Sequence, residues 1–189
     1  MELIKLPIDD FTEEIRACVK KHANVILTAT PGAGKTTRLP PEFLDCVSGQ
    51  VIVLQPRRMA AVAACHRVCE EQGWRVGQEA GYQVRFESKC GSNTRLVFMT
   101  DALLLRRLID DPDLTGIDLV VIDEFHERNL QQDVLLGILK EMQELGRDIK
   151  IVIMSATLDV DHLQRYLPDS MTFDIPGKVF PLEVRYQKQ

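Results

Sequence analysis

The stretch ATPGAGKTT at residues 29–37 lies between an apolar run at 25–30 and a helix-like stretch at 35–46. A glycine-rich turn between a buried strand and a helix is the setting that a phosphate-binding loop requires. Gly32 and Gly34 allow backbone N–H groups to turn toward phosphates, and the helix N-terminus adds the positive end of its dipole. This stretch therefore predicts a phosphate site at the end of a strand.

The side chains that follow the glycines fit the same interpretation. Lys35 can reach the β- and γ-phosphates of a nucleotide, and the hydroxyl of Thr36 suits a Mg²⁺ ion. Ala29 stands where the strict pattern has glycine, which is a mild change of backbone freedom. The combination favours phosphate binding over an incidental lysine in a glycine-rich turn.

Apolar runs and helix-like stretches alternate along the chain. The runs are continuous rather than alternating in polarity, as expected for parallel strands covered on both faces, and they lie at 25–30, 51–55, 94–100, 118–123 and 149–155. The helix-like stretches lie at 10–22, 35–46, 57–72, 101–110, 128–146 and 159–167. This alternation predicts a parallel sheet between two layers of helices, with ligands at the carboxyl ends of the strands. The residues at 81–86 favour a further short strand.

The stretch DEFHER at residues 123–128 follows one of these runs. A carboxylate at the tip of a buried strand is costly unless it meets a cation or hydrogen-bond donors, so Asp123 is a candidate Mg²⁺ ligand opposite Thr36. Glu124 is placed to orient or deprotonate an attacking water. Acidic residues also favour helix N-termini for dipole reasons alone, but the phosphate loop makes the ATPase interpretation the stronger one. His126 has no partner at metal-ligand spacing, which argues against a metal role.

Polar residues follow the other runs as well. The paired arginines in QPRR, at residues 55–58, could bind phosphates, and Thr100 could donate to a backbone oxygen. Arg67 could stack on a base. Solvated arginines are an equally good interpretation of the pattern alone. The stretch SAT at residues 155–157, taken alone, is typical of a helix cap.

Composition restricts the class of protein. The 189 residues fit one domain, five cysteines without a CxxC pair argue against a disulfide framework or a zinc cage, and no apolar run is long enough for a membrane span. The net charge is −5, yet residues 55–107 hold nine Arg and Lys against five Asp and Glu, a weak indication of a binding face. The first seven residues lack the features of a signal peptide. We expect a cytoplasmic protein with no membrane partner.

Taken in order, these motifs resemble the first RecA-like domain of DEAH-box RNA helicases, a group within superfamily 2. The resemblance runs from about residue 8 to residue 189 and rests on ATPGAGKTT, QPRR, TDALLLRRL, DEFHER and MSATL. Phe125 within DEFHER, together with GYQVRFE and FPLEVRY, is most similar to a bacterial branch of the group. The resemblance implies an α/β, RecA-like P-loop NTPase domain that is one lobe of an ATP-dependent RNA helicase.

The resemblance also implies ATP or another NTP, with Mg²⁺, as cofactors. Asp123 and Glu124 would be the metal-binding and water-activating carboxylates, acting with Lys35, and Thr36 would share the Mg²⁺ ion. Arg67 would pack on the adenine, opposite an aromatic residue of a second domain. The residues implied in nucleotide binding are Thr30, Gly32, Ala33, Gly34, Lys35, Thr36, Thr37 and Arg67.

Two further groups of residues receive roles in the same way. RNA backbone contacts fall to Arg57, Arg58 and Thr100. Coupling of the nucleotide state to the RNA and to the partner domain falls to His126, Ser155 and Thr157. Three positions depart from the group: Ala29 and Ala102 stand where glycine is common, and Asn129 stands where threonine is often found and could alter an RNA contact.

The second RecA-like domain of the group has no counterpart in these 189 residues. We therefore expect residues 1–189 to be a single domain of a longer polypeptide, with 180–186 opening a new extended element. Because arginine fingers of a partner domain contribute roughly 10³–10⁵ in rate in such NTPases, the isolated lobe should be a monomer with little activity. Two alternatives remain open: a P-loop ATPase acting on DNA or protein, and a nucleotide-responsive binding module without useful hydrolysis.

Overall fold

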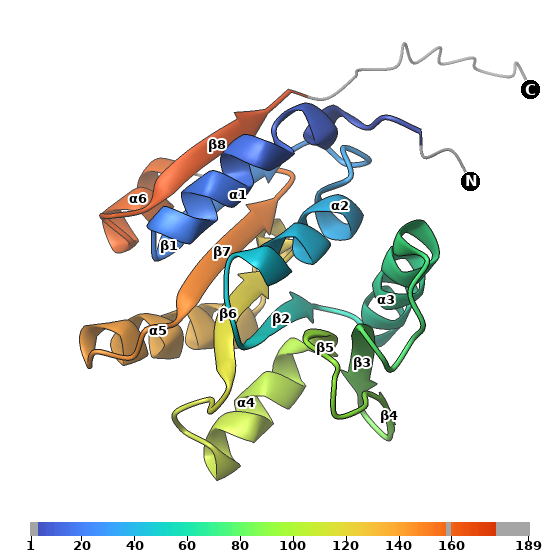
Figure 1. Cartoon of the computed structure of the whole chain (residues 1–189). Helices are drawn as coiled ribbons and strands as arrows, with labels where there is room; N and C mark the ends of the chain where they lie inside the picture. Colours follow the sequence, from blue (N-terminus) through green and yellow to red (C-terminus); the bar gives the residue numbers. More distant parts are fainter. Residues whose placement is uncertain (1–3, 158–159, 177–189) are drawn as a thin grey trace, which may run out of the picture.

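The computed structural model describes residues 4–157 and 160–176 and contains one eight-stranded sheet (Figure 1). The strand order is β4-β3-β5-β2-β6-β7-β1-β8, and all neighbouring strands are parallel except β3 and β4. The strands are β1 (Asn24–Ala29), β2 (Gln50–Gln55), β3 (Ala80–Val84), β4 (Glu87–Lys89), β5 (Leu96–Thr100), β6 (Ile117–Ile122), β7 (Lys150–Ser155) and β8 (Met171–Ile175).

Helices connect the parallel strands and cover both faces of the sheet (Figure 1). The α-helices are α1 (Thr12–Lys21), α2 (Lys35–Glu42), α3 (Arg58–Gln72), α4 (Asp101–Asp110), α5 (Leu130–Glu144) and α6 (Val160–Tyr166). Short 3₁₀ helices are η1 (Pro7–Asp10), η2 (Phe43–Asp45) and η3 (Phe125–Glu127). The predicted α/β architecture, a parallel sheet sandwiched between helices, is confirmed.

Burial on both faces explains why the strands are apolar throughout. In β2, Val51 and Val53 belong to the core beneath α1, α2 and α3, whereas Ile52 and Leu54 belong to the core beneath α4, α5 and α6. All four side chains are fully buried. A strand with one face in water would alternate in polarity instead.

The strand order brings the ends of the central strands together. Strand β1 lies between β7 and β8, while β2 lies between β5 and β6. Because these strands are parallel, the residues that follow β1, β2, β5, β6 and β7 all emerge at one edge of the sheet. This edge carries every motif that the sequence singled out after a strand.

The sequence missed the two strands at the sheet margins. Strand β4 has three exposed polar residues, and β8 is mostly exposed, so neither has an apolar run. The run at 81–86 is also shorter than expected, because the chain turns at Arg85 and Phe86 and pairs β3 with β4 as a hairpin. The predicted extended element at 180–186 lies outside the described residues.

Two glycines should respond in opposite ways to alanine. A Cβ at Gly81, in β3, would collide with the carbonyl oxygen of Lys89 in β4, so G81A should lower the free energy of unfolding by about 1–3 kcal/mol. Gly137 lies inside α5 with only the Tyr166 hydroxyl nearby, at 3.6 Å, so G137A should raise it by about 0.5–1 kcal/mol. Urea unfolding of the two variants checks both values, and equal effects would contradict the hairpin geometry.

Candidate nucleotide-binding and catalytic site

The predicted phosphate loop connects β1 to α2 in the geometry that phosphate binding needs. Gly32 and Gly34 have φ values of 79° and 97°, in the left-handed region that favours glycine. Gly34 is the N-cap of α2, and a Cβ there would meet Leu6 and Ile8 at 2.7 and 3.0 Å. Lys35 is the first helical residue and is buried. The glycine turn therefore ends at the N-terminus of α2, with Lys35 in the first position of the helix.

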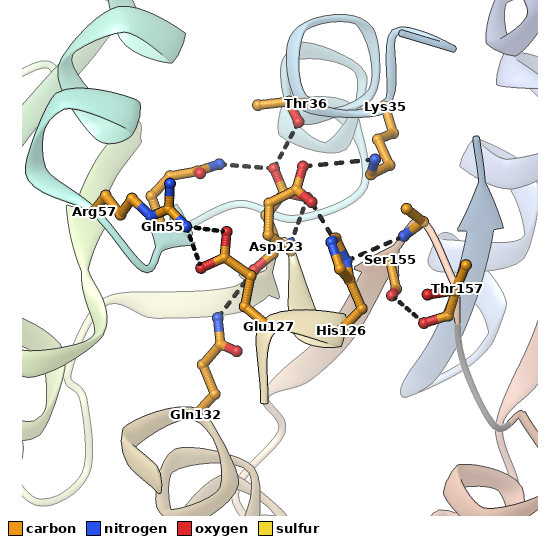
Figure 2. Close-up of polar contacts among 12 residues, drawn as sticks. Lys35, Thr36, Gln55, Arg57, Asp123, His126, Glu127, Gln132, Ser155 and Thr157 are labelled. Atoms are coloured by element: carbon orange, nitrogen blue, oxygen red, sulfur yellow. Dashed lines mark hydrogen bonds and ion pairs between the residues drawn. The ribbon is translucent and has the colours of Figure 1, made fainter. Parts of the chain in front are cut away.

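Asp123 is the central polar group of this edge of the sheet (Figure 2). It follows β6 and is 0% exposed. Its Oδ2 accepts hydrogen bonds from Thr36 Oγ1 at 2.6 Å and from Gln55 Nε2 at 2.7 Å, and its Oδ1 accepts the N–H of Glu124 at 2.8 Å. Donors from α2, β2 and the loop after β6 thus converge on one carboxylate.

Burial raises the pKa of Asp123, because the charged carboxylate loses its water, although the bonds from Thr36 and Gln55 oppose this shift. A divalent cation would offset the same cost. The hydroxyl of Thr36 and the carboxylate of Asp123 are hard oxygen ligands, and one or two protein ligands completed by water and phosphate are the usual Mg²⁺ arrangement. Consistent with that, the described residues contain no group of three His, Cys, Asp or Glu that could hold a metal by themselves. The residues present fit Mg²⁺ bound together with a nucleotide.

Glu124 lies at the mouth of the site between a lysine and a histidine. Its Oε1 is 3.6 Å from Lys35 Nζ, and its Oε2 is 3.4 Å from His126 Nδ1. The same Nδ1 accepts the N–H of Ala156 at 3.3 Å, which links this group to the segment after β7 (Figure 2). Because Nδ1 accepts this hydrogen bond, it has no proton to donate to Glu124, and Lys35 is the charged partner of the carboxylate. A carboxylate in this position can accept a proton from a water.

The backbone around Glu124 is strained. Glu124 and Arg128, on either side of η3, have φ values of 52° and 46°, which side chains other than glycine rarely adopt. Between them, Phe125 is buried in the core beneath α4, α5 and α6. This large apolar side chain anchors the tight turn that presents Glu124 and His126.

A hollow of about 360 Å³ joins these groups. Its lining includes Glu124 and His126 from the segment after β6, Arg67 and Glu71 from α3, and Leu6. From the phosphate loop it receives Pro31, Gly32, Gly34, Lys35, Thr36 and Thr37. The structure therefore brings Arg67 to the predicted nucleotide site, although the two are separated by about one strand and one helix in the sequence.

Two predicted nucleotide-binding residues lie differently. Thr30 is exposed and lines a neighbouring hollow beside residues 4–7 rather than the one that holds Lys35. Ala33 is buried; its N–H donates to the Thr30 carbonyl and its carbonyl accepts the N–H of Ile8, at 3.2 Å each. Ala33 thus holds the shape of the loop in this structure, and its N–H is already engaged.

The residues predicted to contact RNA lie at the same edge of the sheet, outside the hollow. Arg57 is exposed and pairs with Glu127 at 3.1 Å, whereas Arg58 is exposed at the first turn of α3. Thr100 ends β5 and is the N-cap of α4. Arg57 and Arg58 are therefore not equivalent, because the charge of Arg57 already has a partner.

The residues predicted for coupling at the end of β7 make mainly local contacts. Ser155 is fully buried and its hydroxyl donates to the carbonyl of Thr157 at 2.9 Å, while Thr157 itself is exposed. Their neighbour Ala156 makes the contact with His126. The segment 155–157 thus touches the site through its backbone.

The roles of two glutamines were not predicted from the sequence. Gln55 donates to the carboxylate of Asp123, and Gln132 Nε2 donates to its carbonyl oxygen at 3.0 Å. Both are buried. A polar side chain at the end of an apolar run, or on the apolar side of a helix, is the signal that could have revealed them.

Asn129 has a structural role that the sequence left open. Its Oδ1 accepts the N–H of Gln132 at 2.8 Å, so it caps α5, and its Nδ2 donates to the buried carboxylate of Asp101 at 3.0 Å. Burial raises the pKa of Asp101. Asn129 therefore links the starts of α4 and α5, and both ends of its side-chain amide are bonded within the chain.

The hairpin tip is a further feature that the sequence missed. Phe86 is 88% exposed with a φ of 69°, and the guanidinium carbon of Arg85 lies 4.7 Å from its ring centre. Because β3 is parallel to β5, this tip extends from the same edge as Thr100. An exposed aromatic ring beside an arginine is a surface on which a base could stack.

Fold and loop together define a P-loop NTPase domain of the RecA-like class. The family model for the DEAD/DEAH box helicases matches residues 10–166, and the chain belongs to this family. It is similar to the solved structure described as the E. coli DExH-box NTPase HrpB, with 40% identity and a TM-score of 0.88 over 97% of this chain and 23% of that one. A second structure, the Escherichia coli DEAH/RHA helicase HrpB, gives 40% identity and a TM-score of 0.89 over 95% and 23%.

The chain spans less than a quarter of the length of these structures. In the part of this chain that the structure describes, no helix has the length and apolar character to cross a membrane.

The role of Asn129 can be tested by stability. N129A removes the cap of α5 and the donor to Asp101, so it should lower the free energy of unfolding by about 1–3 kcal/mol. N129T keeps a capping oxygen and removes only the donor to Asp101, so its effect should be smaller. Urea unfolding at neutral pH measures both, and an N129A value within about 0.5 kcal/mol of the unsubstituted chain, the range of neutral surface changes, would contradict this assignment.

Proposed function

We propose that this chain is the ATP-binding lobe of an ATP-dependent RNA helicase, in which NTP hydrolysis is coupled to RNA binding and unwinding. The observation that carries the proposal is the contact between Thr36, at the start of α2, and Asp123, at the end of β6. It joins a phosphate loop to a buried acidic strand end, which is the arrangement that P-loop NTPases use to hold a nucleotide with its metal. The family membership of the chain supports the same function.

Nucleotide binding falls to the loop and to α3. The backbone N–H groups at the start of α2 and the Lys35 ammonium would bind the β- and γ-phosphates, with Gly32, Gly34 and Thr37 shaping the cradle. Thr36 and Asp123 would hold Mg²⁺, which draws negative charge from the phosphates when bound. Arg67, which lines the same hollow from α3, would bind the base.

Hydrolysis falls to Glu124. Its carboxylate accepts a proton from the water that attacks the γ-phosphorus, as the bond from that phosphorus to the bridging oxygen of the diphosphate breaks. Lys35 pairs with the carboxylate, and the His126 ring lies beside it. The His126 ring lies between Glu124 and the N–H of Ala156, so we assign coupling to His126 with Ser155 and Thr157.

RNA binding falls to the edge that carries Arg57, Arg58 and Thr100, with the hairpin tip at Phe86 as an additional contact. Arginine and hydroxyl groups there would bind phosphate oxygens, and such recognition tolerates many sequences. An aromatic ring at the hairpin tip would add a stacking contact to a base.

The remaining parts of the proposal concern the intact protein. We propose that residues 1–189 form a single RecA-like domain, that a second such domain supplies the arginines that complete the site, and that the protein acts in the cytoplasm. Alone, the lobe is a monomer that binds nucleotide and hydrolyses it slowly.

Calorimetry with Mg²⁺ and ADP tests nucleotide binding. The unsubstituted chain should bind, and K35A should lose the binding, because the ammonium at the start of α2 faces the phosphates. K140A serves as the control, since Lys140 pairs with Glu144 on α5, away from the loop. Equal binding by K35A and the unsubstituted chain would refute the phosphate assignment.

The two arginines after β2 offer a test of the RNA face. R58A should weaken binding of a single-stranded RNA and reduce the slope of log affinity against log salt by about 1. R57A should change both less, because Glu127 already neutralises Arg57. Fluorescence anisotropy at several salt concentrations, repeated with single-stranded DNA, measures the effect; equal losses in both variants would contradict the assignment to Arg58.

A further inference from the structure

A buried carboxylate on α3 borders the nucleotide hollow without a part in phosphate or metal binding. The side chain of Glu71 is 2% exposed and lines the hollow together with Arg67. Burial of a carboxylate is costly unless it is paired, so this residue needs an explanation. Its two oxygens face two different arginines.

The first oxygen holds Arg67. Oε1 of Glu71 accepts from Nε of Arg67 at 2.7 Å, and Glu70 binds NH1 of the same guanidinium at 3.1 Å. The two pairs differ in environment, because Glu70 is 59% exposed and an exposed pair at this spacing contributes little. The buried partner, Glu71, is therefore the one that fixes the direction of a long and otherwise mobile side chain.

The second oxygen faces Arg38 of α2. Nε of Arg38 lies 3.4 Å from Oε2 of Glu71 and 3.8 Å from Oδ1 of Asp9, and its NH2 donates to the carbonyl of Ile4 at 3.0 Å. Among the described residues, neither Arg38 Nε nor Glu71 Oε2 has a hydrogen-bond partner, so the two atoms meet as an ion pair. Arg38 therefore pairs with Glu71 from α2, the helix that follows the phosphate loop.

The N-terminal segment at residues 4–10 adds further contacts to Arg38 and to the phosphate loop. Oδ2 of Asp9 accepts the N–H of Leu6 at 2.8 Å, and the N–H of Ile8 donates to Ala33 of the phosphate loop at 3.2 Å. Leu6 and Ile8 also pack where a side chain at Gly34 would lie. The charged groups of Asp9, Arg38, Glu71 and Arg67 therefore run from η1 across α2 and α3 to the hollow.

We propose that Glu71 is a positioning residue that holds the guanidinium of Arg67 as a flat platform for the nucleotide base. With carboxylates on its Nε and NH1, Arg67 keeps little uncompensated charge for phosphates, but its plane stays open at a half-exposed position. A guanidinium plane stacks on any base. The inference rests on the proposed function and extends it. The affinity for the base then depends on Glu71, whereas the affinity for the phosphates is independent of Glu71.

The test compares a ligand that has a base with one that lacks it. Calorimetry with Mg²⁺ measures the affinity for ADP and for inorganic tripolyphosphate. E71Q, which keeps the size of the side chain and removes its charge, should weaken ADP by about fivefold or more, the value of one stacking contact, and leave tripolyphosphate unchanged. E70Q is the matched control and should leave both affinities within about twofold, because its pair is exposed.

A double variant shows whether Glu71 acts through Arg67. In the R67A background, E71Q should cause no further loss of ADP affinity, because the platform is already gone. If E71Q does not fold, E71D replaces it: the charge stays, but the shorter side chain retracts from Arg67, so ADP alone should weaken.

Three results would overturn the proposal. They are unchanged ADP affinity in E71Q, an equal loss for ADP and tripolyphosphate, and a further loss of ADP affinity when E71Q is added to R67A. Failure of the unsubstituted chain to bind either ligand would instead refute the proposed nucleotide site, and this inference with it.

Discussion

The arrangement of the site depends on the cost of placing one carboxylate at the buried end of β6. Asp123 has no exposed surface, so its charge needs donors, and the fold supplies them from three directions: Thr36 at the start of α2, Gln55 at the end of β2, and the backbone N–H of Glu124. Each donor is delivered by a different crossover of the sheet. The phosphate loop, the end of β2 and the turn of η3 are thereby held together around one carboxylate.

Sequence reasoning was strongest where one physical cause acts alone. A strand covered on both faces must be apolar throughout, so the five central strands could be predicted to within a few residues, and with them the edge where ligands bind. The phosphate loop could be predicted equally well, because its left-handed backbone requires glycine at positions 32 and 34, and Lys35 stands at the start of the helix that follows. Asp123 could be placed opposite Thr36 because a carboxylate at the end of a buried strand needs a cation or hydrogen-bond donors.

The rest could not be predicted, because it depends on contacts between segments far apart in the chain. Strands β4 and β8 take their pairing from a neighbour and have little apolar surface of their own. Nothing local shows that Gln132 reaches the carbonyl of Asp123, that Asn129 bonds Asp101, or that Glu127 neutralises Arg57. These side chains became visible as parts of a site only when α4, α5 and β6 were placed together.

In the turn at η3, the backbone conformation favours glycine at position 124, whereas the site has a carboxylate there. Left-handed backbone at Glu124 and Arg128 costs roughly 1–2 kcal/mol per residue, and the buried ring of Phe125 is among the contacts that hold it in place. A glycine at 124 would relieve that cost and remove the carboxylate in the same step. At position 124 the backbone conformation and the carboxylate therefore favour different residues, and glutamate keeps the carboxylate at a cost in backbone strain.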